Sequence, residues 1–399
     1  MNLLTKYKLT FLTIIAIPFL NYGVNIGFSL KPYMLLVFLS FLLFPHLNKI
    51  KRISLEELLY VTFLVYYLTS ALWSSYPEMS IKMVILMLIN FVCFFWIRCT
   101  LSEAFKKYGL LRAANVFIKA NVIIYFIALL LYAYGLIVFI KGGVPEGAIV
   151  GSMLVDKGIP RFVAYSFDPN IATIFLSLPL FVSMYIKERD LSISTSFFLF
   201  CLLLTWSRAA IIALILIFVI RTIHFMLIAK KGRAKKFLVL TFFLLFVGTA
   251  FVFLLEHSVI GEMVSKRLDG IQRASGRFDA WENGLKVFFD YPIFGVGIYS
   301  FYMWNINLFD DAHHLHNTYL DVLVEGGVIG LTLFLIMMFV VFIRLVLHRE
   351  RLFSLYLAYL WLFNMILISS LTAISHEGFI FNFVLCSILL SNYKEYDNE

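Results

Sequence analysis

Long apolar segments recur along the whole chain, and no other feature restricts its fold as strongly. Segments of about 17 to 25 residues with few charges have the length that a helix needs to cross the hydrocarbon core of a bilayer. Of the 399 residues, 62% are hydrophobic and 14% are charged, whereas soluble proteins carry roughly 25% charged residues. The mean hydropathy is +0.91. The sequence therefore predicts an all-α polytopic membrane protein that forms a single integral membrane domain over residues 1–399.

The apolar segments predict about twelve transmembrane helices. They lie at residues 9–29, 31–45, 57–74, 81–98, 114–140, 170–187, 191–206, 208–228, 237–255, 321–343, 352–371 and 378–392. The second segment is short, and the seventh ends in the polar sequence "TWSRAA". The first segment carries Pro18, Asn21 and Gly23, which makes it too polar and too long for the apolar part of a cleaved signal peptide. We expect it to be retained.

Lysine and arginine gather in every second loop between these segments. Examples are "HLNKIKR", "KKGRAKK" and "RLVLHRER", and short basic loops are held on the cytoplasmic side. We therefore expect both termini in the cytoplasm, and the loops 141–169 and 256–320 outside. The net charge of +9 then reflects these loops resting against anionic headgroups, so no nucleic-acid partner is expected. The four cysteines form no CxxC pair and carry no information about metals or disulfides.

The large outer loop, residues 256–320, is the one region outside the bilayer that is long enough to fold by itself. Its sequence "GRFDAWENGLKVFFDYP" sets an apolar face against a charged one, with Phe278, Trp281, Leu285 and Phe288 opposite Asp279, Glu282 and Lys286. This spacing predicts an amphipathic helix that lies in the outer interface with its aromatic face in lipid. The next sequence, "YPIFGVGIYSF", predicts a turn at its proline and glycines.

A histidine cluster, "DDAHHLHN", closes this loop. His316 is followed by Asn317 and stands just outside the segment 321–343, where a neutral imidazole near pH 7 can take up a proton. Arg161, Arg208 and Arg277 are expected on the same side. An arginine at membrane depth is costly unless it pairs or serves a site. Several guanidinium groups and a helix N-terminus near one imidazole would form a pyrophosphate site with a base beside it.

Simpler interpretations stand beside this one. The HHxH pattern could hold a metal ion, but no glutamate or cysteine completes a familiar spacing, so no metal is expected. His313 and His314 are typical of solvated loop residues or of supports for His316. Arg208 taken alone could be a flanking charge that extends to the interface. Asp168 in "FDPN" is more typical of a helix cap than of a catalytic group, and the glycines of "VEGGV" are more typical of close helix packing than of binding.

Five motifs in order resemble the O-antigen ligase and O-antigen polymerase superfamily of bacterial membrane glycosyltransferases. They are "ALWSSYPEMS", "RFVAYSFDPN", "TWSRAAIIALIL", "GRFDAWENGLKVFFDYPIFGVGIYSF" and "HLHNTYLDVLVEGGVIGL". Each motif alone is weak, but five in this order on a scaffold of many spans are specific. The resemblance covers about residues 70–335 and implies a core region at 200–335.

The resemblance also implies the substrates and the site. The donor would be a glycan on undecaprenyl diphosphate that has already been flipped outward, and neither a nucleotide sugar nor a cofactor is needed. By position, Arg208 and Arg277 match arginines that bind the diphosphate, and Arg161 matches a basic position before the "DPN" turn. His316 matches the catalytic base, with Asn317 and the two other histidines as supports. The protein would lie in the bacterial inner membrane with its active site facing the periplasm.

The implied reaction is an inverting, metal-independent glycosyl transfer. His316 would remove the proton from an acceptor hydroxyl as that oxygen attacks the anomeric carbon, while the arginines stabilise the departing undecaprenyl diphosphate. A polymerase is favoured over a ligase, which would use lipid A core or a protein as acceptor, because no extended acceptor-binding domain is visible. A chain-length regulator and a flippase are the expected protein partners.

A flippase or transporter of lipid-linked glycans is the alternative of a different class. It predicts polar or charged residues near the middle of several spans, whereas the sequence gathers its charges at the outer ends of the predicted helices.

Overall fold

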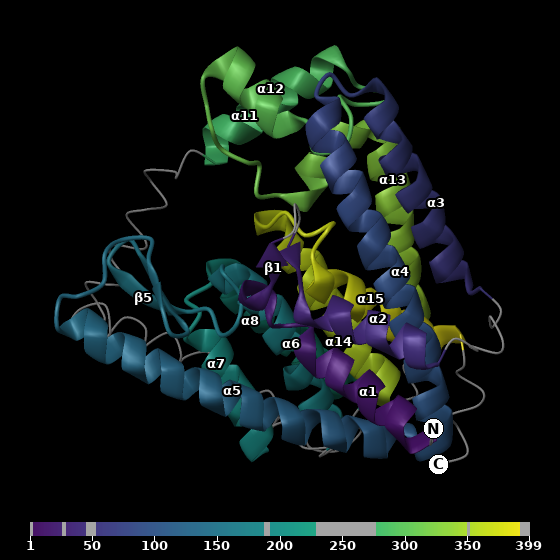
Figure 1. Ribbon diagram of the computed structural model, residues 1–399. Helices are drawn as coiled ribbons and strands as arrows, with labels where there is room; N and C mark the ends of the chain where they lie inside the picture. Colours follow the sequence, from purple (N-terminus) through teal and green to yellow (C-terminus); the bar gives the residue numbers. More distant parts are fainter. Residues whose placement is uncertain are drawn as a thin grey trace.

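The computed structural model describes residues 3–25, 29–44, 53–186, 192–228, 277–348 and 352–391. Helices dominate these residues, so a mostly helical membrane protein is confirmed (Figure 1). Among the described residues, five short strands also form two small antiparallel sheets, which the sequence did not predict.

Within the described residues, six helices are long and apolar enough to cross a membrane. They are α3 with its 3-10 extension η2 (Leu55–Trp73), α4 (Pro77–Tyr108), α5 (Leu110–Ile140), α6 (Pro169–Ile186), α13 (Thr318–Leu347) and α14 with its extension η3 (Leu352–Ser370). Helix α8 (Arg208–Ile228) coincides with the predicted segment 208–228. The predicted segment 237–255 lies outside the described residues, so the number twelve stays a prediction.

Four further apolar helices are shorter than a full span: α1 (Leu3–Ala16), α2 (Pro32–Leu43), α7 (Ile193–Leu203) and α15 (Glu377–Ser391). The single helix predicted over residues 9–29 is wrong. Helix α1 ends at Ala16, and a 3-10 turn (Leu20–Tyr22) and a hairpin of β1 (Val24–Asn25) and β2 (Ser29–Leu30) follow. Pro18 has no N–H for a helical bond and clashes with the preceding turn, which explains the early end.

Residues 141–169, expected as an outer loop, contain the second sheet. It consists of β3 (Ile149–Val150), β4 (Met153–Asp156) and β5 (Ile159–Phe162). The β4–β5 turn has positive φ angles at both Lys157 (56°) and Gly158 (70°), as two-residue hairpins prefer. The Glu146 carboxylate accepts hydrogen bonds from both of these backbone N–H groups. The backbone conformation and hydrogen bonds of this turn stabilise the sheet. A search for long apolar segments does not detect such a sheet.

Helix α13 is broken at Gly327, whose φ and ψ are 65° and −168°. The backbone groups released by this break bond to the segment that follows α11 (Arg277–Asp290). Val296 N–H donates to the Val324 carbonyl at 3.0 Å, and Val328 N–H donates to the Pro292 carbonyl at 2.9 Å. The motifs "YPIFGVG" and "VEGGVIG" thus complete each other's hydrogen bonding.

Glycine is required at both sides of this junction. A Cβ atom on Gly295 would lie 2.5 Å from the Glu325 carbonyl oxygen, and one on Gly327 would lie 2.2 Å from the Ile293 carbonyl oxygen. Both residues also have positive φ angles, which side chains disfavour. The expected close packing of the span glycines therefore takes the form of direct backbone contact.

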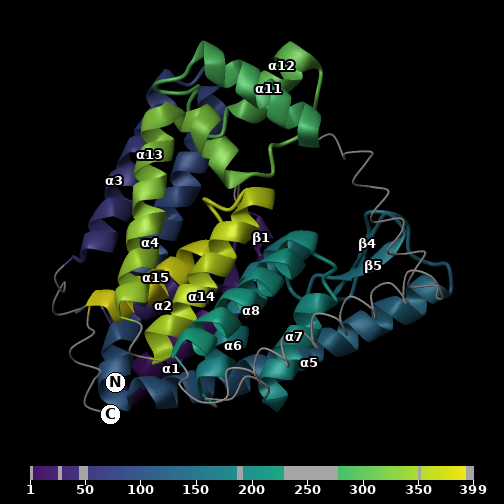
Figure 2. The same cartoon turned by 180° about the vertical axis from the view of Figure 1, so that it is seen from behind.

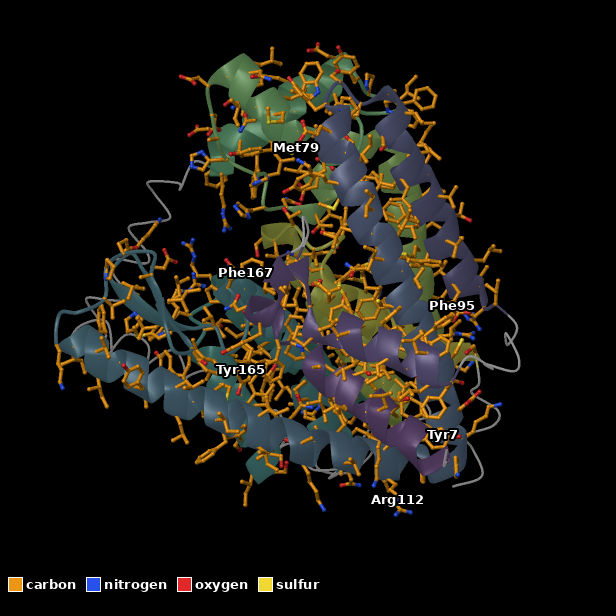
Figure 3. All side chains as sticks on the ribbon, viewed as in Figure 1. Tyr7, Met79, Phe95, Arg112, Tyr165 and Phe167 are labelled. Atoms are coloured by element: carbon orange, nitrogen blue, oxygen red, sulfur yellow. The ribbon has the colours of Figure 1, made fainter. Side chains whose placement is uncertain are left out.

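Helices α11 and α12 (Phe301–Phe309) cover one end of α4 and α13, opposite the end that holds the chain termini (Figures 1 and 2). Figure 3 shows Met79 beside these helices and Arg112 at the terminal end. Phe95 lies on α4 and is 38% exposed. Large apolar side chains are exposed along several helices in the same way, as expected for surfaces in contact with lipid.

Ion pairs connect the helices where α3 begins. The Arg98 Nε atom lies 2.6 Å from Glu57 Oε1, and Arg344 pairs with the fully buried Glu56. Ser387 of α15 also donates to Glu57 at 2.6 Å. These bonds join α3 to α4, α13 and α15. Charges of both signs therefore also lie at the end away from α11.

Candidate functional site

A cleft of about 510 Å³ lies between elements that are far apart in the sequence, and its size is in the usual range of ligand pockets. It brings together Arg161, Arg208, Arg277, His313 and His316. The other lining residues are Asp156, Lys157, Asn170, Trp206, Ala209, Ile212, Trp281, Ile366, Ser369 and Ser370. Five residues that the sequence predicted as site residues or their supports thus line the same cleft.

The loop that carries the histidines, residues 310–317, is anchored from several sides. The Leu315 side chain is fully buried, and the Trp281 indole N–H donates to its carbonyl at 2.7 Å. The Asn305 amide donates to the His313 carbonyl at 3.0 Å. Directly after the loop, Thr318 N–H donates to the Leu371 carbonyl at 3.1 Å. These contacts from α11, α12 and the segment after η3 hold the loop at the edge of the cleft.

His316 has a φ angle of 48°, a left-handed conformation that is uncommon for residues other than glycine. Such backbone outliers gather at functional sites. Burial lowers the pKa of the His316 imidazole to about 4, and the Arg277 guanidinium adds to this shift. The ring is therefore neutral at pH 7 and can accept a proton.

Two of the cleft arginines stand at helix starts. Arg208 is the first residue of α8, and Arg277 is the first residue of α11. Ser207 before Arg208 accepts a hydrogen bond from Ala210 N–H at 3.4 Å, so it caps α8. Helix N-termini carry partial positive charge and attract anions. Each arginine therefore adds its charge to a helix end.

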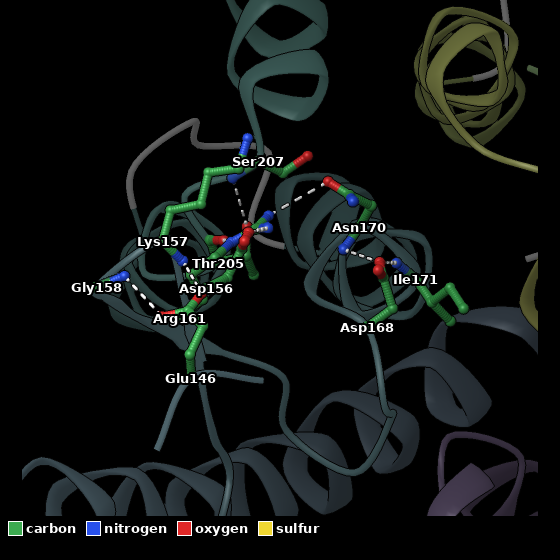
Figure 4. A network of polar contacts seen from close by, with 10 residues as sticks. All are labelled: Glu146, Asp156, Lys157, Gly158, Arg161, Asp168, Asn170, Ile171, Thr205 and Ser207. Carbon is green, nitrogen blue, oxygen red and sulfur yellow. Dashed lines mark hydrogen bonds and ion pairs between the residues drawn. The ribbon is translucent and has the colours of Figure 1, made fainter. Parts of the chain in front are cut away.

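Arg161 has a different environment. Its side chain is buried and donates hydrogen bonds to Asp156 Oδ2 at 2.7 Å, to the Thr205 carbonyl at 2.9 Å and to Asn170 Oδ1 at 3.4 Å (Figure 4). It joins the sheet to the corner before α8, and no sequence pattern predicted these bonds. Arg161 thus contributes charge to the cleft while its guanidinium is bonded to other protein groups.

The described residues that line the cleft include four cations, Lys157, Arg161, Arg208 and Arg277, and one carboxylate, Asp156. This excess of positive charge favours an anionic ligand. Lys157, Trp206 and the two serines of η3 were not anticipated. The turn "VDKGIP" could have indicated Lys157, whereas only folding brings Ser369 and Ser370 to the cleft.

Residues 193–335 match the family model described as O-antigen ligase. This region of the chain is similar to an O-antigen ligase domain. This confirms the O-antigen ligase and polymerase superfamily as the one that the motifs resemble. No curated protein matches the chain. The match supports a membrane role of the O-antigen ligase or polymerase type, and it suggests a glycosyltransferase-like enzyme.

The O-antigen ligase domain contributes Arg208, Arg277 and His316 to the cleft. The rest of the wall lies outside the matched residues, with Arg161 from β5 and Ser369 and Ser370 from η3. The cleft is therefore completed by elements that precede and follow the domain.

The three histidines have different surroundings. His313 lines the cleft and bonds to Asp311. His314 lines a separate cavity, and its ring stacks on Tyr302 with centroids 4.3 Å apart. Among the residues that the structure describes, no group of three or more His, Cys, Asp or Glu side chains is arranged to hold a metal ion.

Two polar residues near the site cap helices. Asp168 accepts hydrogen bonds from the N–H groups of Asn170 (2.6 Å) and Ile171 (3.1 Å), which is the cap expected for α6 (Figure 4). Asn317 accepts from Tyr319 N–H at 3.1 Å and Leu320 N–H at 3.3 Å, and so caps α13. Asn317 thereby defines where α13 begins, directly after His316.

Helix α11 is amphipathic, but the expectation that its whole aromatic face lies in lipid is wrong. Trp281 and Phe288 pack against a small core that includes Leu315 and Val324, while Phe278 is 57% exposed. The buried residues of α11 are Ala280, Asn283, Gly284 and Val287. Small residues let α11 approach the histidine loop closely, and this contact positions Arg277.

Proposed function

We propose that this protein is a membrane glycosyltransferase that moves a glycan from undecaprenyl diphosphate to an acceptor hydroxyl at the outer face of the bacterial inner membrane. One observation carries the proposal: Arg208, Arg277 and His316, which are distant in sequence, line a single cleft rich in cations. This arrangement supports an anion site beside a neutral base, as this reaction requires.

The cations of the cleft would bind the diphosphate. A guanidinium group can form two parallel hydrogen bonds to phosphate oxygens, and Arg208 adds its charge to the N-terminus of α8. Negative charge grows on the diphosphate as the glycosidic bond breaks. Donors already oriented towards that charge lower the barrier most. Arg161, held by Asp156, would support the charge of the cleft from one side.

His316 would act as the base. Its neutral imidazole takes the proton of the acceptor hydroxyl while the hydroxyl oxygen attacks the anomeric carbon. The carbon–oxygen bond to the diphosphate breaks on the opposite side, so the configuration inverts. The scheme includes no metal ion, because arginines and a helix terminus supply the positive charge.

We favour polymerisation, in which one lipid-linked repeat is joined to another, as the specific form of the reaction. Ligation to lipid A core or to a protein is the second candidate, because the matching family model is described as O-antigen ligase. Both forms use the same donor site and differ in the acceptor.

The glycan profile of a deletion strain tests the proposal and separates the two forms. A single repeat unit left on the core would identify a polymerase. Bare core with accumulating lipid-linked polymer would identify a ligase. An unchanged profile of every surface glycan would contradict the proposed function.

Orientation has its own test, because the proposed site must face the periplasm. A cysteine introduced within residues 141–169 should react with a membrane-impermeant maleimide in whole cells, whereas one within residues 230–236 should not. The reverse pattern would place the cleft on the cytoplasmic side and contradict the use of an outward-flipped donor.

A further inference from the structure

Trp206 lies in the corner between α7 and α8, two residues before Arg208, and its side chain lines the cleft. Its φ angle is 52°, a left-handed conformation that is uncommon for residues other than glycine. Backbone outliers of this kind persist only where the surrounding structure holds them, and they gather at functional sites. The corner thus accepts an unfavourable backbone conformation at the residue that brings a large aromatic side chain to the wall of the cleft.

Hydrogen bonds hold this corner from two sides. From α7, the Leu203 carbonyl accepts from Trp206 N–H at 3.0 Å, and the Leu202 carbonyl accepts from the Thr205 hydroxyl at 2.7 Å. From β5, Arg161 Nε donates to the Thr205 carbonyl at 2.9 Å. The backbone of Trp206 is therefore held in place by the protein itself, and a ligand that uses its side chain has little ordering to do.

The surroundings of Trp206 differ from those of the other tryptophans. Each of the others packs against at least one aromatic ring: Trp73, Trp96, Trp281, Trp304 and Trp361. Among the residues that the structure describes, Trp206 has no ring partner and no hydrogen bond to its indole N–H, and it is only half-buried. Both the face of the indole and its N–H group can therefore serve a ligand in the cleft.

This side of the cleft has the composition that a sugar requires. The C–H groups on one face of a pyranose ring are apolar and pack on an aromatic ring, and its hydroxyls accept from an indole N–H. Ser369 and Ser370 line the same cleft. Their hydroxyls donate to the carbonyls of Ile366 and Leu367 at 2.7 and 3.1 Å, so their oxygens keep lone pairs for sugar hydroxyls. An aromatic face with a few polar groups is typical of small-molecule sites.

We propose that Trp206 forms a sugar subsite, in which its indole stacks on the sugar that is attached directly to the diphosphate. This inference rests on the proposed function, in which Arg208 binds the diphosphate. Only one oxygen atom separates that sugar from the nearer phosphorus, and Trp206 precedes Arg208 by two residues. Stacking holds the anomeric carbon in one orientation between the diphosphate and His316, so the acceptor oxygen meets it on the side opposite the leaving group.

The test compares the binding of two lipids, undecaprenyl diphosphate with its glycan and undecaprenyl diphosphate alone, to fluorescently labelled protein in nanodiscs. Trp206→Leu keeps an apolar side chain but removes the aromatic face and the N–H group. Its Kd for the lipid with the glycan should rise by about tenfold or more, the scale of a lost aromatic stacking contact. Its Kd for undecaprenyl diphosphate alone should equal that of wild type, because this lipid has no sugar.

Two further variants keep the test decisive. Trp206→Phe retains a smaller aromatic face, so its loss of binding to the lipid with the glycan should be smaller than that of Trp206→Leu. Binding of undecaprenyl diphosphate alone reports, in the same samples, that the cleft is intact. Trp73→Leu is the matched control, because Trp73 is 40% exposed and does not line the cleft. It should bind both lipids as wild type does.

Wild-type binding of the lipid with the glycan by both Trp206→Leu and Trp206→Phe would overturn the sugar subsite. An equal loss for the two lipids in Trp206→Leu would also overturn it, and would mean that the indole contacts the polyprenyl tail or supports the fold. If the wild-type protein binds neither lipid and transfers nothing, the proposed function itself fails. The two failures are therefore distinguishable.

Discussion

Arginines at two ends of the molecule illustrate two uses of the same side chain. Where α3 begins, Arg98 is 5% exposed and its guanidinium lies against Glu57, while Arg344 lies against Glu56. In the cleft, Arg208 is exposed, and cations outnumber carboxylates among the described lining residues. An arginine matched by a carboxylate joins helices, whereas a surplus of cations around a hollow favours an anionic ligand. The difference lies in the surroundings of the side chain.

The largest expected effect concerns the base in the cleft. His316→Ala should reduce the transfer rate by about 10² to 10⁴, the usual contribution of a general base. The measurement is transfer of a purified lipid-linked glycan in nanodiscs, with and without EDTA. Full activity in His316→Ala would remove the proposed role. Equal losses for all three histidines that respond to added zinc would favour a metal site.

Arg208→Lys separates charge from geometry. Lysine keeps the positive charge but loses the two-pronged hydrogen bonding of the guanidinium. We expect transfer to fall by about 10² or more, the scale of losing one oriented donor to a developing charge, while the amount of protein in the membrane stays normal. If both Arg208→Lys and Arg208→Ala were fully active, Arg208 would be a flanking charge only.

Arg98→Gln makes the opposite change at the other end of the molecule. Removing one partner of a buried ion pair typically costs about 3 to 5 kcal/mol, because the other charge stays buried. We therefore expect a clear loss of thermal stability, with a nearly normal rate per folded molecule. Thermal unfolding in detergent and transfer at low temperature measure the two quantities. A stable but inactive variant would mean that the paired arginines also serve the reaction.

The pH dependence of kcat/KM tests whether the charge of a cleft arginine acts on His316. A base must be unprotonated, so kcat/KM should persist at acidic pH and fall only as the pH approaches about 4, the lowered pKa of His316. Arg277→Gln removes one cause of that lowering, although burial, the larger cause, remains. The fall of kcat/KM at acidic pH should therefore occur at a slightly higher pH in Arg277→Gln than in wild type. A fall at the same pH in both proteins would show that Arg277 does not act on His316.

His313→Ala should have the smallest effect. His313 lines the cleft, is 54% exposed and bonds to Asp311. We therefore expect it to support the histidine loop and not to transfer the proton. We expect a loss of a few-fold at most, far below the ~10² or more of a general base. A loss equal to that of His316→Ala in the same assay would contradict this assignment.

The sequence was informative where one physical signal dominated. Apolar length identified α3, α5, α6, α13 and α14 within a few residues, because a bilayer demands it. It also identified α4, but this helix extends to Tyr108, well beyond the predicted end at residue 98. The cost of an arginine at membrane depth also indicated Arg208, and the amphipathic spacing indicated the helix that begins at Arg277. Both residues then proved to share one cleft with His316.

The sequence was uninformative where distant segments determine the structure. The break of α13 at Gly327 is stable because residues 292–297 form hydrogen bonds with its released backbone groups. These two segments are about 30 residues apart, so no local sequence pattern contains both. In the same way, Arg161 bonds to the Thr205 carbonyl, 44 positions away. The separation of His314 from His316 into different cavities depends on the burial of Leu315 between them.

The most direct test of the central claim measures donor binding and transfer on the same samples. In nanodiscs, wild type, His316→Ala and Arg208→Ala would be titrated with a fluorescent undecaprenyl-diphosphate glycan and then assayed for transfer. The account predicts that His316→Ala binds the donor like wild type but transfers about 10² to 10⁴ times more slowly, whereas Arg208→Ala binds weakly. Normal donor binding by Arg208→Ala, or lost binding by His316→Ala, would contradict the division of the cleft into an anion site and a base.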